Sequence, residues 1–303
     1  MPTIMKNTEN TMRYYKTLIL SLYFMMHGSA IAAPDLTQKV GLTVADETSK
    51  YYRFEQLAFT SVDQQRHYRI TVAVPKAPAP SSGYPTLYML DGNAALATLS
   101  DQKFSRLQGA DLPVIITMGY DTELYFDVIA RAYDYTPELA PEVQQHEARQ
   151  YGGAETFWQF VEHTIKPKVA QLANLDPDRQ ALWGHSFAGL FVLHTLFNHP
   201  DSFQTYIAAD PSLWWQQGLI LKAETPYQQR NKRPQAQVLI QRSSSQRDNE
   251  NLQDDATRNL AKRLSLMPEL EVQYHEYFQQ THGSLLAASI PAALRMAQGI
   301  IYE

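Results

Sequence analysis

The chain has 303 residues, of which 44% are hydrophobic and 19% are charged, and this composition is typical of a folded globular protein rather than of a disordered chain. Its formal net charge of −5 argues against a nucleic-acid-binding surface. The sequence contains no cysteine, so disulfides cannot contribute and the stability of the fold must come from burial of a core.

The first 32 residues have the pattern of an export signal. Basic residues precede an apolar run at 17–26, and a small-residue A-x-A cleavage site ends at Ala32. The alternative is an uncleaved anchor helix, but a membrane span needs about 20 apolar residues and this run is about half as long. We therefore expect residues 1–32 to be a signal peptide and the mature chain, 33–303, to be periplasmic, with no stable membrane anchor.

Strand patterns begin at 51–60 and 67–74, where apolar and polar residues alternate with a period of two, as in a hairpin or an edge pair. A short proline-rich segment follows. Beyond it lie four short apolar runs of the kind that forms buried parallel strands, at 86–90, 113–118, 180–183 and 237–240.

Helical spacing of apolar residues separates these runs, most clearly over 154–172. Alternating strands and helices predict an α/β fold with a mostly parallel sheet, helices on both faces and an antiparallel pair at its start. Functional loops of such a sheet follow the C-terminal ends of its strands. The long segment 119–153 is therefore a candidate active-site loop, and 33–303 is expected to form one domain.

The motif that carries chemistry is Gly-His-Ser-Phe-Ala-Gly at 184–189, between a predicted strand and a predicted helix. This is the context of a nucleophile elbow, the tight turn that exposes a serine at the top of an α/β-hydrolase sheet, and it predicts Ser186 as the nucleophile. Ala188 replaces the second glycine of the usual G-x-S-x-G pattern. The alternative interpretation is that Gly184 ends a strand and Ser186 only caps a helix.

A serine hydroxyl needs a base to take its proton, and in this fold the histidine comes last in the chain. His282 fits, because it follows a strand-like segment at 270–278 and precedes a C-terminal helical run. The other histidines near these elements, His194, His199 and His275, are interpreted as packing or surface residues.

The chain resembles the Putative esterase branch of the α/β-hydrolases, and within it the periplasmic trilactone esterases that cut enterobactin-type siderophores. The resemblance covers nearly the whole mature chain. It rests on the segments YPTLYMLDGN at 84–93, RAYDYTP at 131–137, GGAETF at 152–157, WGHSFAG at 183–189 and DPSLWW at 210–215.

This resemblance implies an oxyanion hole formed by the backbone amides of Asn93 and Phe187. It also implies that an anionic, aromatic catecholate substrate is bound by an arginine and neighbouring rings, which are Arg131, Tyr133, Trp214 and Trp215 in this sequence. Two alternatives stay open. Arg131 could instead pair with Asp134 or Asp127 in a solvated loop, and the two tryptophans could be core or rim packing.

The sequence does not single out one acid that would orient His282. In this fold the acid usually follows a late strand, here 237–241, but the first carboxylate after it is Asp248. Some siderophore esterases of this kind are understood to work with a Ser–His dyad, and Ser245 stands near the position where relatives place a carboxylate. The prediction is therefore a dyad, or a triad with Asp248 as the best single candidate.

The sequence predicts a serine carboxylic-ester hydrolase that cleaves the trilactone backbone of a catecholate siderophore without a metal or an organic cofactor. The first alternative is a periplasmic esterase or thioesterase for another acyl substrate. The second is a non-catalytic binding protein on the same fold.

Overall fold

The computed structural model describes residues 37–107, 111–244 and 252–300. Residues from Leu36 onward form one compact unit. The predicted signal peptide, 1–32, and the candidate acid Asp248 lie outside the described residues.

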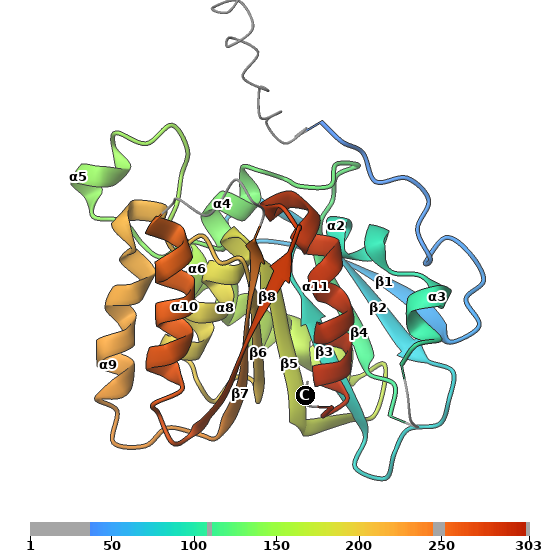
Figure 1. Ribbon diagram of the computed structural model, residues 1–303. Coiled ribbons are helices and arrows are strands. Elements are labelled where there is room, and N and C mark those ends of the chain that lie inside the picture. Colours follow the sequence, from blue (N-terminus) through green and yellow to red (C-terminus); the bar gives the residue numbers. More distant parts are fainter. Residues whose placement is uncertain (1–36, 108–110, 245–251, 301–303) are drawn as a thin grey trace, which may run out of the picture. The chain divides into compact units, whose positions relative to one another are not determined.

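Within the described ranges, eight strands form one sheet in the order β1-β2-β4-β3-β5-β6-β7-β8 (Figure 1). β1 pairs antiparallel with β2 and β2 antiparallel with β4, whereas the remaining neighbours are parallel. The predicted α/β sheet with an antiparallel N-terminal pair is therefore confirmed. The strands are β1 (Tyr52–Thr60), β2 (His67–Pro75), β3 (Tyr84–Met89), β4 (Val114–Tyr120), β5 (Leu175–His185), β6 (Thr205–Ala209), β7 (Ala236–Ser244) and β8 (Leu270–Phe278).

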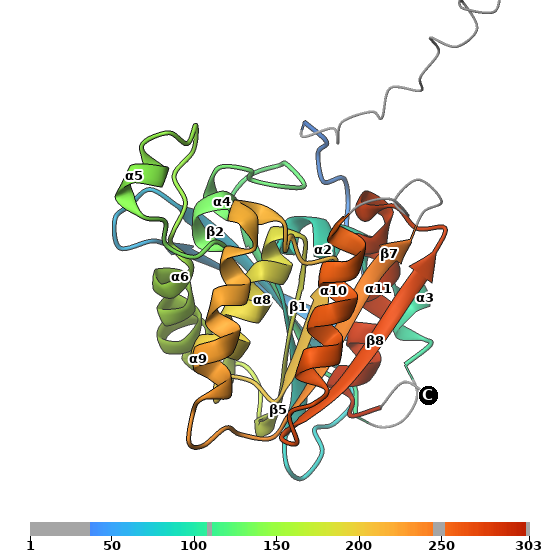
Figure 2. The same ribbon diagram turned by 60° about the vertical axis from the view of Figure 1, so that its left-hand side comes forward.

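Helices cover both faces of the sheet (Figures 1 and 2). The predicted helix over 154–172 is interrupted by one π-helical turn, η1 (Val161–Ile165). The α-helices are α2 (Gly92–Thr98), α3 (Asp101–Phe104), α4 (Ala130–Asp134), α5 (Pro141–Gln144), α6 (Ala154–Phe160), α7 (Lys166–Ala170), α8 (Phe187–Asn198), α9 (Glu224–Gln228), α10 (Leu252–Leu264) and α11 (His282–Ala297), and two 3₁₀ turns are η2 (Trp215–Gln217) and η3 (Leu219–Ala223).

Two hydrophobic clusters form the core, one on each face of the sheet. Successive side chains of a strand point to opposite faces, so Tyr88 and Leu90 belong to the cluster with α6 and α8, while Leu87 and Met89 belong to the cluster with α2 and α11. Among the described residues, no helix is both long and apolar enough to cross a bilayer.

The turns that follow the parallel strands all lie at the C-terminal edge of the sheet. Met89 of β3 lies beside Trp183 of β5, so the turns after these strands are neighbours. β6 and β7 continue the parallel arrangement on the other side of β5. The predicted active-site loop, 119–153, contains α4 and α5, which lie at this end of the sheet in Figure 1.

Candidate active site

Ser186 occupies a sharp turn between β5 and α8. Its backbone has φ 62° and ψ −120°, a conformation that costs energy for a residue other than glycine and is typical of a nucleophile elbow. The turn is tight: a Cβ added at Gly184 would lie 2.4 Å from the carbonyl oxygen of Ala188. Since Gly184 has no side chain, the methyl group of Ala188 fits where the usual motif has glycine.

His282 reaches the serine from the first turn of α11. Thr281 and Ser284 form a capping box that begins this helix. The Nε2 atom of His282 lies 3.0 Å from the Oγ atom of Ser186, which is hydrogen-bond distance for a general base. A second hydroxyl, that of Ser212, lies 3.1 Å from the same Oγ. The structure thus brings together the two residues that the sequence singled out.

A carboxylate that the sequence interpretation missed lies beside His282. Asp210 follows β6, and its Oδ2 atom is 3.3 Å from Nδ1 of His282. The backbone amide of Ser243 donates to Oδ1 of Asp210 at 2.8 Å, and the Ser243 hydroxyl donates to Oδ2. Ser186, His282 and Asp210 therefore have the arrangement of a complete Ser–His–Asp triad.

The electrostatics keep Asp210 ionised. Its burial raises the pKa, but hydrogen bonds from His282 and from the side chain and amide of Ser243 outweigh this and hold the pKa below its ordinary value. An ionised acid at this position accepts from Nδ1–H of His282. It thereby leaves Nε2 as the acceptor that faces Ser186.

Asp210 is therefore a candidate acid that the sequence interpretation did not name. The dyad and Asp248 stay predictions, and Asp248 lies outside the described residues. Asp210 was missed because β6 was not among the predicted strands. The available signal was the apolar run Tyr206–Ala209 directly before Asp210. The backbone of Asp210 has a φ of 40°, a left-handed conformation that aspartate adopts more readily than most residues.

His185 contacts the backbone of His282. It is buried, and its Nε2 lies 2.8 Å from the backbone carbonyl oxygen of His282. Burial, and then the Coulomb interaction with the neighbouring His282, lower the pKa of His185 to about 3. His185 is therefore a neutral imidazole at neutral pH and donates Nε2–H to that carbonyl.

The two amides predicted to form the oxyanion hole lie in neighbouring turns. Phe187 is the first residue of α8, and Asn93 lies in the first turn of α2. Amides in a helical first turn have no acceptor within their own helix. The Asn93 side chain has another task, since its Nδ2 donates to the carbonyl oxygens of Tyr120, Thr122 and Leu124 at 2.9–3.1 Å and so fixes the start of the active-site loop.

Arg131 is engaged within the protein. Its Nε and Nη2 atoms bind the two carboxylate oxygens of Asp91 at 2.8 Å each, and the two side chains are 13% and 1% exposed. Neither of the acidic partners considered from the sequence takes this place. A bidentate pair already neutralises the guanidinium, so the geometry favours Arg131 as a brace for the turn before Asn93 over an open receptor for an anion.

The predicted aromatic residues divide into exposed and packed ones. Trp214 is 58% exposed and lies 6.4 Å, between ring centroids, from Phe187. Trp215 is buried against Tyr151, with ring centroids 5.3 Å apart. Tyr133 is covered by Arg66, whose guanidinium carbon lies 4.3 Å from the ring centre. Trp214 is thus the predicted ring best placed to meet a ligand.

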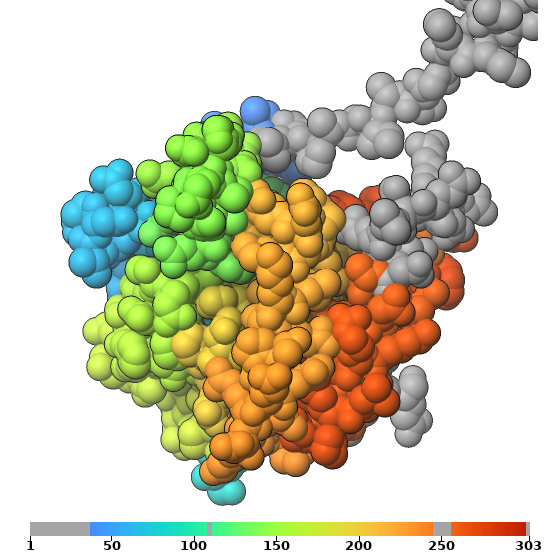
Figure 3. Space-filling view, turned by 90° about the vertical axis from the view of Figure 1, so that its left-hand side faces the viewer, coloured from blue at the N-terminus to red at the C-terminus, as the bar shows by residue number. Residues whose placement is uncertain are grey.

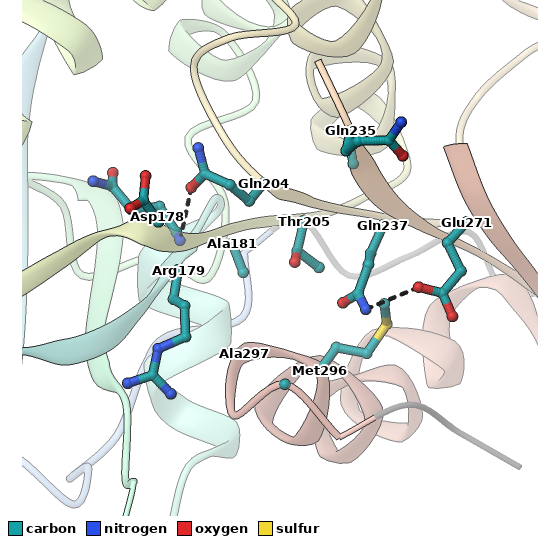
Figure 4. Close-up of a pocket in the computed structure, with 13 residues that line it drawn as sticks. Asp178, Arg179, Ala181, Gln204, Thr205, Gln235, Gln237, Glu271, Met296 and Ala297 are labelled. Carbon is teal, nitrogen blue, oxygen red and sulfur yellow. Dashed lines mark hydrogen bonds between the residues drawn. The ribbon is translucent and has the colours of Figure 1, made fainter. Parts of the chain in front are cut away.

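The site is open at the surface. The side chain of His282 is 47% exposed. A separate hollow of about 320 Å³ lies between α11 and the N-terminal ends of β5 to β8, lined by both polar and apolar residues, such as Arg179, Glu271 and Met296 (Figure 4). That hollow is at the opposite edge of the sheet from Ser186, and it contains no paired nucleophile and base.

A strained serine with a histidine and an aspartate at the C-terminal edge of an α/β sheet defines a serine hydrolase of the α/β-hydrolase fold. The family model described as "Putative esterase" matches residues 61–280, and the chain belongs to this family of esterases.

Named relatives and a solved structure agree with this assignment. The chain is 45% identical to the apo-salmochelin esterase of Escherichia coli O6:H1 over 186 residues, which are 60% of this chain and 58% of that protein. It is 32% identical to the ferri-bacillibactin esterase BesA of Bacillus subtilis over 255 residues, 78% of this chain and 87% of that protein. The structure of enterobactin hydrolase IroE in complex with DFP matches with a TM-score of 0.71 at 36% identity, covering 85% of this chain and 99% of that one.

Proposed function

We propose that this protein is an exported serine esterase that hydrolyses the lactone esters of a catecholate siderophore. The observation that carries the proposal is the contact of 3.0 Å between Ser186 Oγ and His282 Nε2 at a strained elbow. The names of the relatives supply the substrate class, since the names quoted above refer to salmochelin, bacillibactin and enterobactin.

The reaction begins when Ser186 Oγ attacks the ester carbonyl carbon and His282 Nε2 takes the hydroxyl proton. Asp210 stabilises the imidazolium that forms. The backbone amides of Asn93 and Phe187 donate to the oxyanion of the tetrahedral intermediate, each contributing on the order of 3 kcal/mol of barrier reduction.

The intermediate then collapses. The bond to the leaving alkoxide breaks, His282 returns the proton to it, and the acyl group stays on Ser186. Water attacks the acyl-enzyme, with His282 again taking the proton, and the carboxylic acid leaves as Ser186 is restored.

The open surface suits a substrate too large for a closed pocket. The exposed Trp214 offers a flat apolar face on which a catechol ring can stack. Because Arg131 is already paired with Asp91, it contributes little to the binding of a negatively charged, iron-loaded catecholate.

The test is hydrolysis of ferric and iron-free enterobactin beside p-nitrophenyl acetate and an acyl thioester. A siderophore esterase has a kcat/KM for the trilactone far above that for the other substrates. Comparable values for all of them would assign a generalist esterase instead. N-terminal sequencing of protein recovered from the periplasm tests the export proposal, which expects a start near Ala33.

A further inference from the structure

A second cluster of potential ligands lies away from Ser186, where α6 meets the C-terminal end of α8. It consists of Glu155 in the first turn of α6, His194 in α8 and His199 just after α8. The Oε2 atom of Glu155 is 2.7 Å from Nε2 of His199 and 3.7 Å from Nε2 of His194. The three potential ligand atoms all lie within 4.8 Å of one another. Figure 3 views the molecule from the side that carries α6 and α9.

The imidazole of His194 is the unusual member. The residue is only 8% exposed, and its Nε2 atom has no hydrogen-bond partner among the described residues. A buried polar atom without a partner costs free energy and calls for an explanation.

The other two residues are held in place from outside the cluster. The His199 ring stacks on Trp158 with centroids 3.4 Å apart and an interplanar angle of 7°. Gln159 donates to the second carboxylate oxygen of Glu155 at 3.4 Å. The Asn198 side chain lies 3.1 Å from Nδ1 of His194. A ligating histidine commonly bonds a polar group through its other ring nitrogen, and Asn198 occupies that position.

We propose that Glu155, His194 and His199 form a zinc site with water as the fourth ligand. Two imidazole nitrogens and one carboxylate oxygen are a ligand set that Zn²⁺ uses in proteins, with bonds of about 2.0–2.2 Å. Tetrahedral bonds of this length put ligand atoms about 3.3 Å apart, so small rotations of the three side chains suffice. Binding through Nε2 places the proton of His194 on Nδ1. The Asn198 amide must then turn its oxygen toward that proton, and it gives up the 3.0 Å hydrogen bond from its Nδ2 to the backbone carbonyl of His194.

The ion would tie α6 to α8, the helix that begins at the nucleophile elbow. A metal that binds the folded chain stabilises it by mass action. The direct test is isothermal titration of ZnCl₂ into the untagged protein, together with its melting temperature in saturating Zn²⁺. We expect one ion per chain and a rise in melting temperature of about 5–10 °C.

The variants separate this site from the rest of the chain. Glu155→Gln and His199→Ala, at surface-accessible positions, should each weaken zinc binding by about tenfold or more. His163→Ala is the matched control, because this exposed histidine also contacts Trp158, at 5.9 Å between centroids, but lies outside the cluster. It should bind zinc as the wild type does.

The catalytic residues offer a competing location, since His185, Asp210 and His282 also lie within reach of one ion. Zinc binding should therefore persist in a His282→Ala variant. The proposal is overturned if the wild type binds no zinc, if binding disappears with His282, or if Glu155→Gln and His199→Ala bind as tightly as His163→Ala. Far-UV circular dichroism confirms that each variant is folded.

Discussion

Replacing Asp210 with asparagine tests whether Asp210 takes part in catalysis as the third member of the triad. The two side chains have the same shape, and asparagine also tolerates the left-handed backbone at this position, where φ is 40°. The variant should therefore fold like the wild type. The change removes one charge and places an amide group next to Nδ1 of His282.

The expected loss follows from the hydrogen bonds around Asp210. The Ser243 amide donates to one oxygen of Asp210 at 2.8 Å. In the variant this hydrogen bond holds the Asn oxygen in the same place, so the new NH₂ group faces Nδ1 of His282. Facing a donor, Nδ1 becomes the acceptor and the proton moves to Nε2. His282 then presents N–H to Ser186 and can no longer take its proton.

In a serine protease triad this exchange lowers kcat by about 10⁴. The contact here is 3.3 Å and His282 is 47% exposed, so water can replace part of the interaction. Loss of a charge-assisted hydrogen bond of about 1.5–3 kcal/mol lowers a rate by a factor of roughly 10–150. The wrong tautomer of His282 lowers kcat further. We expect a loss in kcat of at least about 100-fold.

The assay is hydrolysis of p-nitrophenyl acetate, and then of enterobactin, by wild type and variant. Asp201→Asn is the control, because it removes the same charge from an exposed aspartate. A loss of less than tenfold in Asp210→Asn would refute the triad and restore a Ser–His dyad, in which His185 and solvent alone orient His282.

Three further substitutions test the nucleophile elbow, the Arg131–Asp91 pair and the exposed ring of Trp214. Gly184→Ala should destabilise the protein by about 1–3 kcal/mol, because the new Cβ meets backbone at 2.4 Å, whereas Gly283→Ala, with nothing within 4 Å, should be neutral or stabilising in denaturant unfolding. Arg131→Ala should lower both siderophore and small-ester hydrolysis and cost about 3–5 kcal/mol of stability by leaving Asp91 unpaired; loss of the siderophore reaction alone would make Arg131 an anion receptor. Trp214→Ala should raise KM for enterobactin severalfold at unchanged kcat for p-nitrophenyl acetate, and an unchanged KM would exclude the ring from binding.

The sequence could predict those parts of the fold that depend on local periodicity. Alternation at 51–60 and 67–74 and the buried runs after them correspond to strands of the observed sheet. The elbow was recognisable because its chemistry and its strand–turn–helix context are local. His282 was recognisable because chain order within the fold points to the last histidine.

The acid was not predictable in the same way, because its place depends on the order of strands in the sheet. Asp210 reaches His282 from the turn after β6, which lies between β5 and β7. The sequence interpretation looked after β7, where Ser243 instead supports Asp210. The run before Asp210 is apolar like the runs that were predicted as buried strands, but an apolar run alone does not show which strand lies beside β5.

The role of Arg131 also depends on a distant partner. Asp91 is 40 residues away in sequence, and nothing local marks it as the counter-ion. A charged residue in a motif suggests recognition of a charged substrate until its partner within the protein is known. The pairing favours support of the active-site turns over direct substrate recognition as the role of Arg131.

The most direct test of the central claim is to incubate the wild type and Ser186→Ala with enterobactin and to follow the trilactone and its linear products by liquid chromatography and mass spectrometry. The account predicts that the wild type opens the ring and that the variant, folded by circular dichroism, is slower by about 10⁴ or more. Ring opening by Ser186→Ala at a rate near that of the wild type would contradict it.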